Sequence, residues 1–244
     1  MKVCVILQAR MGSARLPGKV LKEVLGKPLL EYQCERLDRV KLKDETIITT
    51  SIGDSDRPIV DFCRKRALVC FRGPEEDVLA RFEGAALSRA ADVVVRLTGD
   101  CPLIDPEIVD RVIEFYLTNN AHYDYVSNVF KRTYPRGMDC EVFSRRALWE
   151  AQREAKLPAE REHVTRFIYS HPERYRLGSV THSEDQSRHR WTVDTPEDFE
   201  LIRKILTELY PRKPHFTMND VLALLAGHSE WEQLNAHVQQ KETH

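Results

Sequence analysis

The sequence predicts a three-layer α/β/α fold, in which helices cover both faces of a mostly parallel sheet. Up to residue 119, short apolar runs of strand type alternate with amphipathic helical patterns, the order expected of strands joined by crossover helices. Aromatic side chains and polar turns follow, which indicates an inserted β-containing arm over residues 120–185. With 244 residues and no linker rich in Pro, Gly or Ser, the chain suits one domain over residues 1–244.

The charge balance and the cysteines indicate which binding partners and which cellular compartment are expected. The 37 basic and 38 acidic side chains give a net charge of −1, which argues against binding to nucleic acid or a membrane surface. Six scattered cysteines without a C-x-x-C pair indicate buried free thiols in a reducing compartment. No signal peptide and no run near the ~20 apolar residues of a membrane span is found, so a cytoplasmic location is expected.

The first half is expected to supply four buried strands and four helices. The strands cover residues 3–7, 46–50, 68–71 and 93–97, all rich in apolar and β-branched side chains. The helices begin near Pro28, at a cap formed by Ser55, at Asp77 and at Pro106. Each helix then shows apolar residues at helical spacing, which predicts one buried face.

Helix-start signals organise the second half. Thr195 is the expected N-cap of a helix with Pro196 as its first residue and Asp198 as its capping-box acid. Two further helices are expected to start at Ser144 and Thr217. Two further strands are expected at residues 175–181, which alternate like an exposed strand, and at residues 190–194.

A small, basic loop at residues 8–19 follows the first strand. It holds Arg10, Arg15 and Lys19, together with two glycines and Ser13, and no acid occurs before Glu23. Converging backbone N–H groups and basic side chains of this kind favour an anion. The spacing matches neither G-x-x-x-x-G-K-[ST] nor G-x-G-x-x-G, and a basic surface turn is the alternative interpretation.

Two acidic residues are expected close to this loop. Asp100 follows the strand at 93–97 in the segment Thr98-Gly99-Asp100, and Asp194 ends the strand expected at 190–194. Ligands of parallel sheets bind at the carboxyl ends of strands, and Mg²⁺ takes one or two carboxylates plus phosphate oxygens. The pair is therefore a candidate Mg²⁺ site. The alternatives are a structural strand-end Asp100 and an Asp194 that caps a helix.

The loop pattern A-R-x-x-S-x-R-L-P-G-K after an N-terminal strand resembles the nucleotide loop of the sugar-activating nucleotidyltransferases. Within them it is most similar to the CMP-sugar synthetases and the spore coat polysaccharide biosynthesis protein F group. The resemblance implies a Rossmann-like fold and a catalytic Mg²⁺ held by an Asp in a G-D segment and an Asp in a V-D-T/S-P-E-D segment. Both motifs are matched, by Asp100 and Asp194.

The same resemblance implies the nucleotide site. Its expected residues are Gln8, Ala9, Arg10, Gly12, Ser13, Arg15, Lys19, Arg72, Arg81, Thr98 and Gly99, with Arg10, Lys19, Asp100 and Asp194 as the catalytic group. Arg10, Ser13, Arg15 and Lys19 would hold the triphosphate, and the backbone near Gln8 and Ala9 would meet the base. For Arg81 the alternative is an i,i+4 pairing with Asp77 at a helix start.

An acceptor pocket and dimer contacts are implied for residues 120–185. The acceptor residues expected there are Arg136, Asp139, Glu141, Glu162, His163 and Thr165. Asp139 and Glu141 would share one face of a strand and read adjacent hydroxyls, or form an exposed polar face. His163 would orient the acceptor or act as a base, or lie on a helix surface.

The function expected from this resemblance is nucleotidyl transfer from CTP (or another NTP) to a sugar, giving a CMP-sugar and pyrophosphate for surface or spore coat polysaccharide. A homodimer is expected. No arginine-rich signature of an acidic-sugar acceptor can be traced, so a sugar-1-phosphate nucleotidylyltransferase is an alternative. A glycosyltransferase, a class that favours a D-x-D metal motif, and a non-catalytic nucleotide-sugar binding protein are further alternatives.

Overall fold

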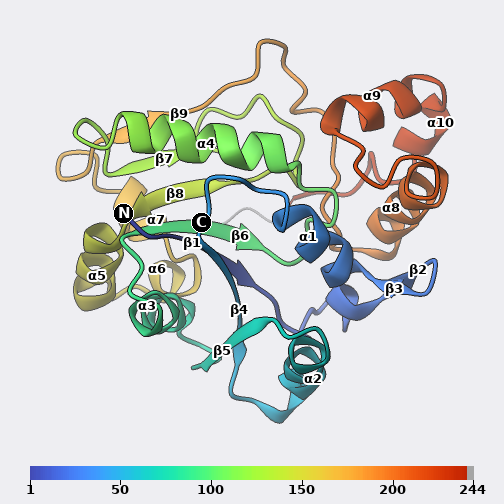
Figure 1. Cartoon of the computed structure of the whole chain (residues 1–244). Helices are drawn as coiled ribbons and strands as arrows, with labels where there is room; N and C mark the ends of the chain where they lie inside the picture. Colours follow the sequence, from blue (N-terminus) through green and yellow to red (C-terminus); the bar gives the residue numbers. More distant parts are fainter. Residues whose placement is uncertain (241–244) are drawn as a thin grey trace.

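The structure is a computed structural model that describes residues 1–240. A seven-stranded sheet forms its centre (Figure 1). The strand order is β5 (Val69–Gly73), β4 (Glu45–Ser51), β1 (Val3–Gln8), β6 (Val93–Thr98), β8 (Glu141–Ser144), β7 (Tyr125–Ser127) and β9 (Leu177–Ser179). All strands run in one direction except β8, which is antiparallel to β6 and β7. The mostly parallel sheet is thus confirmed.

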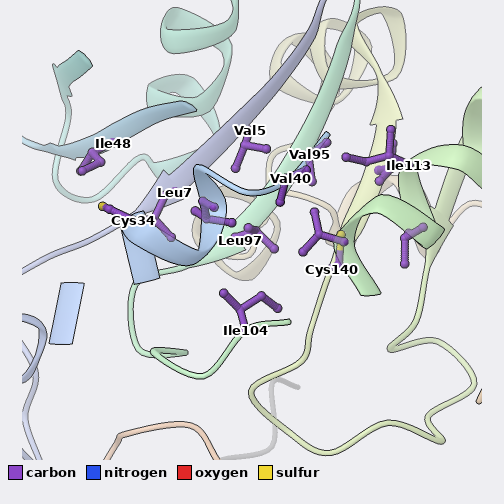
Figure 2. Close-up of a cluster of buried hydrophobic side chains, with 14 of the residues drawn as sticks. Val5, Leu7, Cys34, Val40, Ile48, Val95, Leu97, Ile104, Ile113 and Cys140 are labelled. Atoms are coloured by element: carbon purple, nitrogen blue, oxygen red, sulfur yellow. The ribbon is translucent and has the colours of Figure 1, made fainter. Parts of the chain in front are cut away.

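Helices cover both faces of the sheet, as the sequence predicts. One face packs against α1 (Leu29–Leu37), α2 (Arg57–Lys65) and α4 (Pro106–Thr118). The other packs against α3 (Val78–Ser88), α5 (Arg145–Glu154) and α7 (Arg166–Tyr169). Successive residues of a strand point to opposite faces, so both sets of side chains must be apolar in a central strand. Strand β1 shows this, because Val5 and Leu7 join the first cluster (Figure 2). Cys4 and Ile6, on the opposite face, join the second.

A third apolar cluster lies beside the sheet, under the C-terminal helices. It joins α8 (Pro196–Leu209) and α9 (Met218–Ala226) to α1 and to Trp191, and α10 (Ser229–Glu232) follows α9. The predicted capping box at Thr195 is confirmed, since the Thr195 side chain accepts from the Asp198 N–H and the Asp198 side chain from the Thr195 N–H. Thr217 caps α9 and Ser144 caps α5, as predicted.

The region 120–185 is partly built into the central sheet. Its strands β7, β8 and β9 extend the sheet beyond β6, while α5 and α6 (Pro158–Glu162) pack against α3 and α7 packs against α5 and α6. The remaining small elements are the hairpin of β2 (Glu23–Val24) and β3 (Lys27–Pro28) and the 3-10 turns η1 (Lys19–Leu21) and η2 (Asp54–Asp56). All six cysteines are free, and five of them are buried.

The strand expected at residues 190–194 is wrong. This segment forms only an isolated bridge between Arg136 and Arg190, and Val193 N donates to the Asp100 carbonyl (2.8 Å). Its apolar residues Trp191 and Val193 are buried in the third cluster rather than in the sheet. A short apolar run cannot be assigned to a sheet by its pattern alone. The exposed strand expected at 175–181 is shorter, covering only β9.

Within residues 1–240, none of the helices combines the length and the apolar composition that crossing a lipid bilayer requires.

Candidate active site

The basic loop is anchored between β1 and η1 by buried backbone contacts. Asp56 is 2% exposed, and its carboxylate accepts the N–H groups of Met11 (2.7 Å) and Ser51 (3.0 Å). Gly18 has a φ of +68° and donates to the Met11 carbonyl (2.9 Å), which closes the loop in a conformation that suits glycine. The loop is therefore held in one shape and presents its basic side chains at the end of the sheet.

Gly99 brings the end of β6 against the end of β1. Its N–H donates to the Gln8 carbonyl (2.7 Å), and a Cβ at this position would lie 2.9 Å from the same oxygen. Only glycine permits that approach without a shift of the backbone. Asp100 consequently lies beside the basic loop, where the Thr98 hydroxyl donates to its Oδ1 (2.6 Å).

Lys19 joins the two predicted metal ligands. Its Nζ is 2.8 Å from Asp100 Oδ2 and 2.7 Å from Asp194 Oδ1. Burial disfavours the ammonium, but the attraction of both carboxylates outweighs this and raises the pKa of Lys19. Burial alone would raise the pKa of Asp100, yet Lys19 holds it below its usual value. The two acids thus converge on one cation-binding point, although 94 residues of sequence separate them (194 − 100).

Two arginines complete the surroundings of Asp194. Arg15 Nη2 lies 3.1 Å and Arg190 Nη2 2.7 Å from Asp194 Oδ2. The donor set fits a small hard cation, because two carboxylates already aim at one point and phosphate oxygens would supply further ligands. Among residues 1–240, no group of three or more Asp, Glu, His or Cys side chains is placed to hold a metal. Any ion bound here would therefore take its remaining ligands from the phosphate oxygens of the nucleotide.

Two adjoining cavities lie at this end of the sheet. The first, about 310 Å³, is bordered by the basic loop, and the second, about 460 Å³, extends toward β8 and the loop before it. Both are lined by Arg10, Arg15, Arg96, Thr98, Asp100, Glu162, His163 and Asp194. Gln8, Gly12, Ser13, Lys19 and Gly99 line the first cavity only. Ala9 is buried in the core under the loop.

The residues expected to bind the acceptor surround the second cavity. They are Arg136, Asp139, Glu141, Glu162, His163 and Thr165, and all six line it. Burial lowers the pKa of His163, at the end of α6, so its imidazole is neutral near pH 7. Arg136 has no side-chain hydrogen bond or ion pair to any of residues 1–240, although it lies in a cavity wall. It is therefore available for an anionic or hydroxylated ligand.

Asp139 and Glu141 do not share a strand face as expected, because β8 begins only at Glu141. Asp139 accepts two hydrogen bonds from Arg132 (2.6 and 2.9 Å). Glu141 is 5% exposed, forms an ion pair with Arg96, and accepts the hydroxyls of Tyr125 and Thr165 (both 2.6 Å). Their oxygens are already engaged, so the pair shapes the cavity wall through internal contacts.

Arg72 and Arg81 lie outside both cavities. Arg72 donates to the carbonyls of Ser51, Ile52 and Gly53, and the buried Arg81 donates to the Pro74 carbonyl (2.7 Å). Within residues 1–240 the Arg81 side chain makes no hydrogen bond or ion pair with the Asp77 carboxylate; only the backbone N–H of Arg81 donates to the Asp77 carbonyl (3.1 Å).

Asp77 instead caps α3 through the Ala80 N–H and pairs with Arg161 on α6. Through that ion pair it ties α6, and with it Glu162 and His163, to the sheet domain.

The residues that sequence reasoning missed are mostly basic partners. Arg96, Arg132 and Arg190 each pair with an acid that lines the second cavity. The role of Arg96 could have been predicted, because a single charged residue inside the apolar run Val93–Leu97 needs a partner when it is buried. The sequence does contain a D-x-D triplet, Asp54–Asp56, so the absence of this motif is no argument against a glycosyltransferase. Its Asp56 binds backbone N–H groups of the basic loop and of β4, so that acid is structural.

Comparison with known proteins settles the family. A family model described as cytidylyltransferase matches residues 4–243, nearly the whole chain. The chain belongs to the cytidylyltransferase family. The resemblance inferred from the basic loop is thereby confirmed, and the loop, Asp100 and Asp194 all lie inside the matched range of this cytidylyltransferase.

Individual relatives are similar to the chain over nearly its whole length. An uncharacterized protein of Methanocaldococcus jannaschii is 36% identical over 99% of this chain and 97% of its own. The spore coat polysaccharide biosynthesis protein SpsF of Bacillus subtilis is 35% identical over 90% of this cytidylyltransferase and 92% of its own length. A solved structure of a cytidylyltransferase from Leptospira borgpetersenii is 31% identical, with a TM-score of 0.91 and 99% of each chain covered.

Proposed function

We propose that this cytidylyltransferase joins CTP to a sugar hydroxyl, giving a CMP-sugar and pyrophosphate. The observation that carries the proposal is the convergence of Asp100 and Asp194 on Lys19 at the mouth of the basic loop. Opposite charges gathered at one point suit a triphosphate chelated to a cation, the usual form of a nucleotide donor. Membership of the cytidylyltransferase family supports cytosine as the base of the nucleotide and nucleotidyl transfer as the class of reaction.

The first cavity suits the nucleotide. Arg10, Ser13 and Arg15 line it and offer donors to phosphate oxygens, while Gly12 lets the backbone approach closely. The Gln8 side chain adds a buried oxygen that has no hydrogen-bond partner in the described residues. This oxygen would accept a hydrogen bond from the amino group of cytosine. These groups would bind CTP with its α-phosphate toward the second cavity.

The chemistry would rest on positioning and charge. Mg²⁺, when bound, would be held by Asp100 and Asp194 and would neutralise charge on the phosphates. Lys19 and Arg15, which now contact those two carboxylates, would turn their donors to the departing pyrophosphate. The protein needs no covalent intermediate, since holding the two reactants in line already lowers the barrier.

His163 is the proposed base. It lines both cavities and therefore lies where they adjoin, which is where an acceptor hydroxyl would meet the α-phosphate. The hydroxyl oxygen would form the new bond to phosphorus, the bond from phosphorus to the pyrophosphate oxygen would break, and the hydroxyl proton would pass to His163. Its lowered pKa keeps the imidazole neutral and able to accept that proton near pH 7.

The acceptor class is open between two candidates. The second cavity has the polar lining expected for a sugar, and the relative from Bacillus subtilis is named for spore coat polysaccharide biosynthesis, which supports an acceptor from such a pathway. Arg136, whose side chain has no hydrogen bond or ion pair within residues 1–240, specifically favours an acceptor with an anionic group. A sugar-1-phosphate is therefore the second candidate. In that case its phosphate oxygen would attack the α-phosphate of CTP, the bond from that phosphorus to the pyrophosphate oxygen would break, and the product would be a CDP-sugar.

A mass-spectrometric screen tests the proposal. Purified protein with Mg²⁺ would be offered each of the four NTPs with a panel of free sugars and sugar phosphates. We expect a new CMP-sugar with CTP, release of pyrophosphate, and loss of both in Asp100→Asn but not in the exposed-residue control Glu107→Gln. Nucleotide binding without any product, unchanged by Asp100→Asn, would contradict an enzymatic role.

A homodimer and a cytoplasmic location stay predictions. Light scattering coupled to gel filtration would test the first, since a monomeric mass would contradict the dimer.

A further inference from the structure

The carboxylate of Asp198 is at the centre of a buried polar network beside the proposed nucleotide site. Asp198 is 0% exposed, and its two oxygens accept hydrogen bonds from five donors. Two are backbone N–H groups, those of Asp194 (2.9 Å) and Thr195 (3.1 Å). A cap for α8 needs only the Thr195 contact, so the remaining donors indicate a second role.

Arg190 connects this network to the acid in the cavity. Its Nε lies 2.9 Å from Asp198 Oδ1, and its Nη2 lies 3.0 Å from Asp198 Oδ2 and 2.7 Å from Asp194 Oδ2. The guanidinium is planar and its fork is rigid, so the bidentate contact with Asp198 fixes where its remaining donors point. One of these donors meets Asp194, whose other oxygen meets Lys19.

The C-terminal segment closes the network. Asn235, which is 4% exposed, donates from Nδ2 to Asp198 Oδ1 (2.8 Å) and to the Arg190 carbonyl (2.9 Å). Gln240 accepts a hydrogen bond from Arg190 Nη1 and lines the second cavity. Asn235 itself lines neither of the two cavities. A residue outside both cavities thus binds the backbone carbonyl of Arg190 and its carboxylate partner Asp198.

We propose that Asp198 and Asn235 are positioning residues, which hold Arg190 against Asp194 and so set the affinity of the nucleotide site for its divalent cation. The inference rests on the proposed function, because it takes Asp194 as a ligand of the metal–nucleotide complex. Groups that orient a ligand carboxylate by hydrogen bonds determine how well it binds a metal. Without Asn235, Arg190 would be less firmly held, and Asp194 would rotate away from the point it shares with Asp100.

The metal-dependent gain in CTP affinity tests this. Calorimetry would measure CTP binding without acceptor, once with Mg²⁺ and once with EDTA, for the wild type, Asn235→Ala and the control Gln239→Ala. Gln239 is exposed, lies on the same segment, and makes no hydrogen bond or ion pair with the described residues. We expect Asn235→Ala to lower the ratio of the two affinities by about 10-fold, as outer partners of metal ligands typically do, with the EDTA affinity unchanged.

A second variant separates positioning from folding. Asn235→Asp has almost the same shape, but it removes both donated hydrogen bonds and places a negative charge beside Asp198, so it should lower the ratio at least as much. Equal losses with Mg²⁺ and EDTA, or an unchanged ratio in both Asn235 variants, would overturn the inference while leaving the proposed function intact. A wild type that gains no CTP affinity from Mg²⁺ would overturn the proposed metal site and this inference together.

Discussion

Lys19 Nζ lies 2.7 Å from Asp194 Oδ1, although 175 positions of sequence separate the two residues. The same ammonium is 2.8 Å from Asp100. A single positive charge therefore occupies the point at which both acids are directed. A divalent cation would have to compete for that point, and a triphosphate would offer Lys19 new acceptors. The charge balance predicts that metal and nucleotide bind together rather than independently.

Replacing Lys19 should change the affinities for the metal and for CTP in opposite directions. In Lys19→Met, we expect Mn²⁺ to bind the nucleotide-free protein more tightly, because both carboxylates lose their competing cation. CTP affinity in EDTA should fall by about 10-fold or more, the loss expected for one hydrogen bond to a charged group. Electron paramagnetic resonance would follow free Mn²⁺ and calorimetry would follow CTP. The exposed Lys65→Met serves as the control, and weaker Mn²⁺ binding in Lys19→Met would contradict the competition.

Arg136 should act on the acceptor alone. Arg136→Ala removes from the second cavity a guanidinium that has no partner among residues 1–240, so the KM for the acceptor should rise by about 10-fold to 100-fold while the KM for CTP is unchanged. Steady-state kinetics with each substrate varied would measure this. Lys131→Ala, exposed on the same loop, is the matched control. If both KM values rose equally, Arg136 would not be an acceptor residue.

The pH dependence of kcat/KM tests His163 as the base. Burial lowers its pKa from the ordinary value of 6.5, so the reactive neutral form is lost only as the pH falls below 6.5. The rate should therefore show an acid limb with a midpoint under that value. His163→Gln should slow the reaction and abolish the limb, whereas the exposed His122→Gln should keep it. An identical limb in His163→Gln would assign the titration to another group.

The Glu141–Arg96 ion pair should make stability depend on pH. Burial would raise the pKa of Glu141, but the attraction of Arg96 and the donated hydroxyls hold it below the ordinary value of 4.5. A lowered pKa in the folded state contributes stability above pH 4.5, and this contribution is lost as the pH falls through the folded value. Glu141→Gln should therefore lower the free energy of unfolding by about 3 kcal/mol at pH 7, because it leaves Arg96 without its counter-charge.

Urea denaturation at pH 7 and at successively lower pH would check that linkage. The difference between wild type and Glu141→Gln should shrink below pH 4.5, whereas the exposed Glu173→Gln should differ little at any pH. A difference that stayed constant down to acid pH would show that Glu141 stabilises by shape rather than by charge.

Local sequence rules predicted much of the fold because they describe local causes. The run Val93–Leu97 is rich in β-branched residues and forms the buried strand that was predicted, and Thr195, Pro196 and Asp198 each satisfy a separate requirement of a helix start. The strand predicted at residues 190–194 is not formed. An apolar residue such as Trp191 indicates that a segment is buried, but it does not indicate the hydrogen-bonding partners of the backbone. Burial under α8 and burial in a sheet leave the same pattern.

The candidate site was predictable where a motif fixes the position of a residue at the end of a strand. Asp100 and the basic loop lie at the ends of neighbouring strands, so their proximity follows from the parallel order of β1 and β6. The partners Arg96, Arg132 and Arg190 could not be found in this way, because an ion pair depends on tertiary contacts. Arg72 and Arg81 were predicted to bind the nucleotide, but both donate to backbone carbonyls outside the cavities.

A crystal structure with CTP and Mn²⁺ tests the central claim most directly. The account predicts an anomalous peak between the carboxylates of Asp100 and Asp194, in contact with phosphate oxygens, with Lys19 moved onto the triphosphate. A triphosphate bound away from the basic loop, or a metal that touches neither acid, would contradict it.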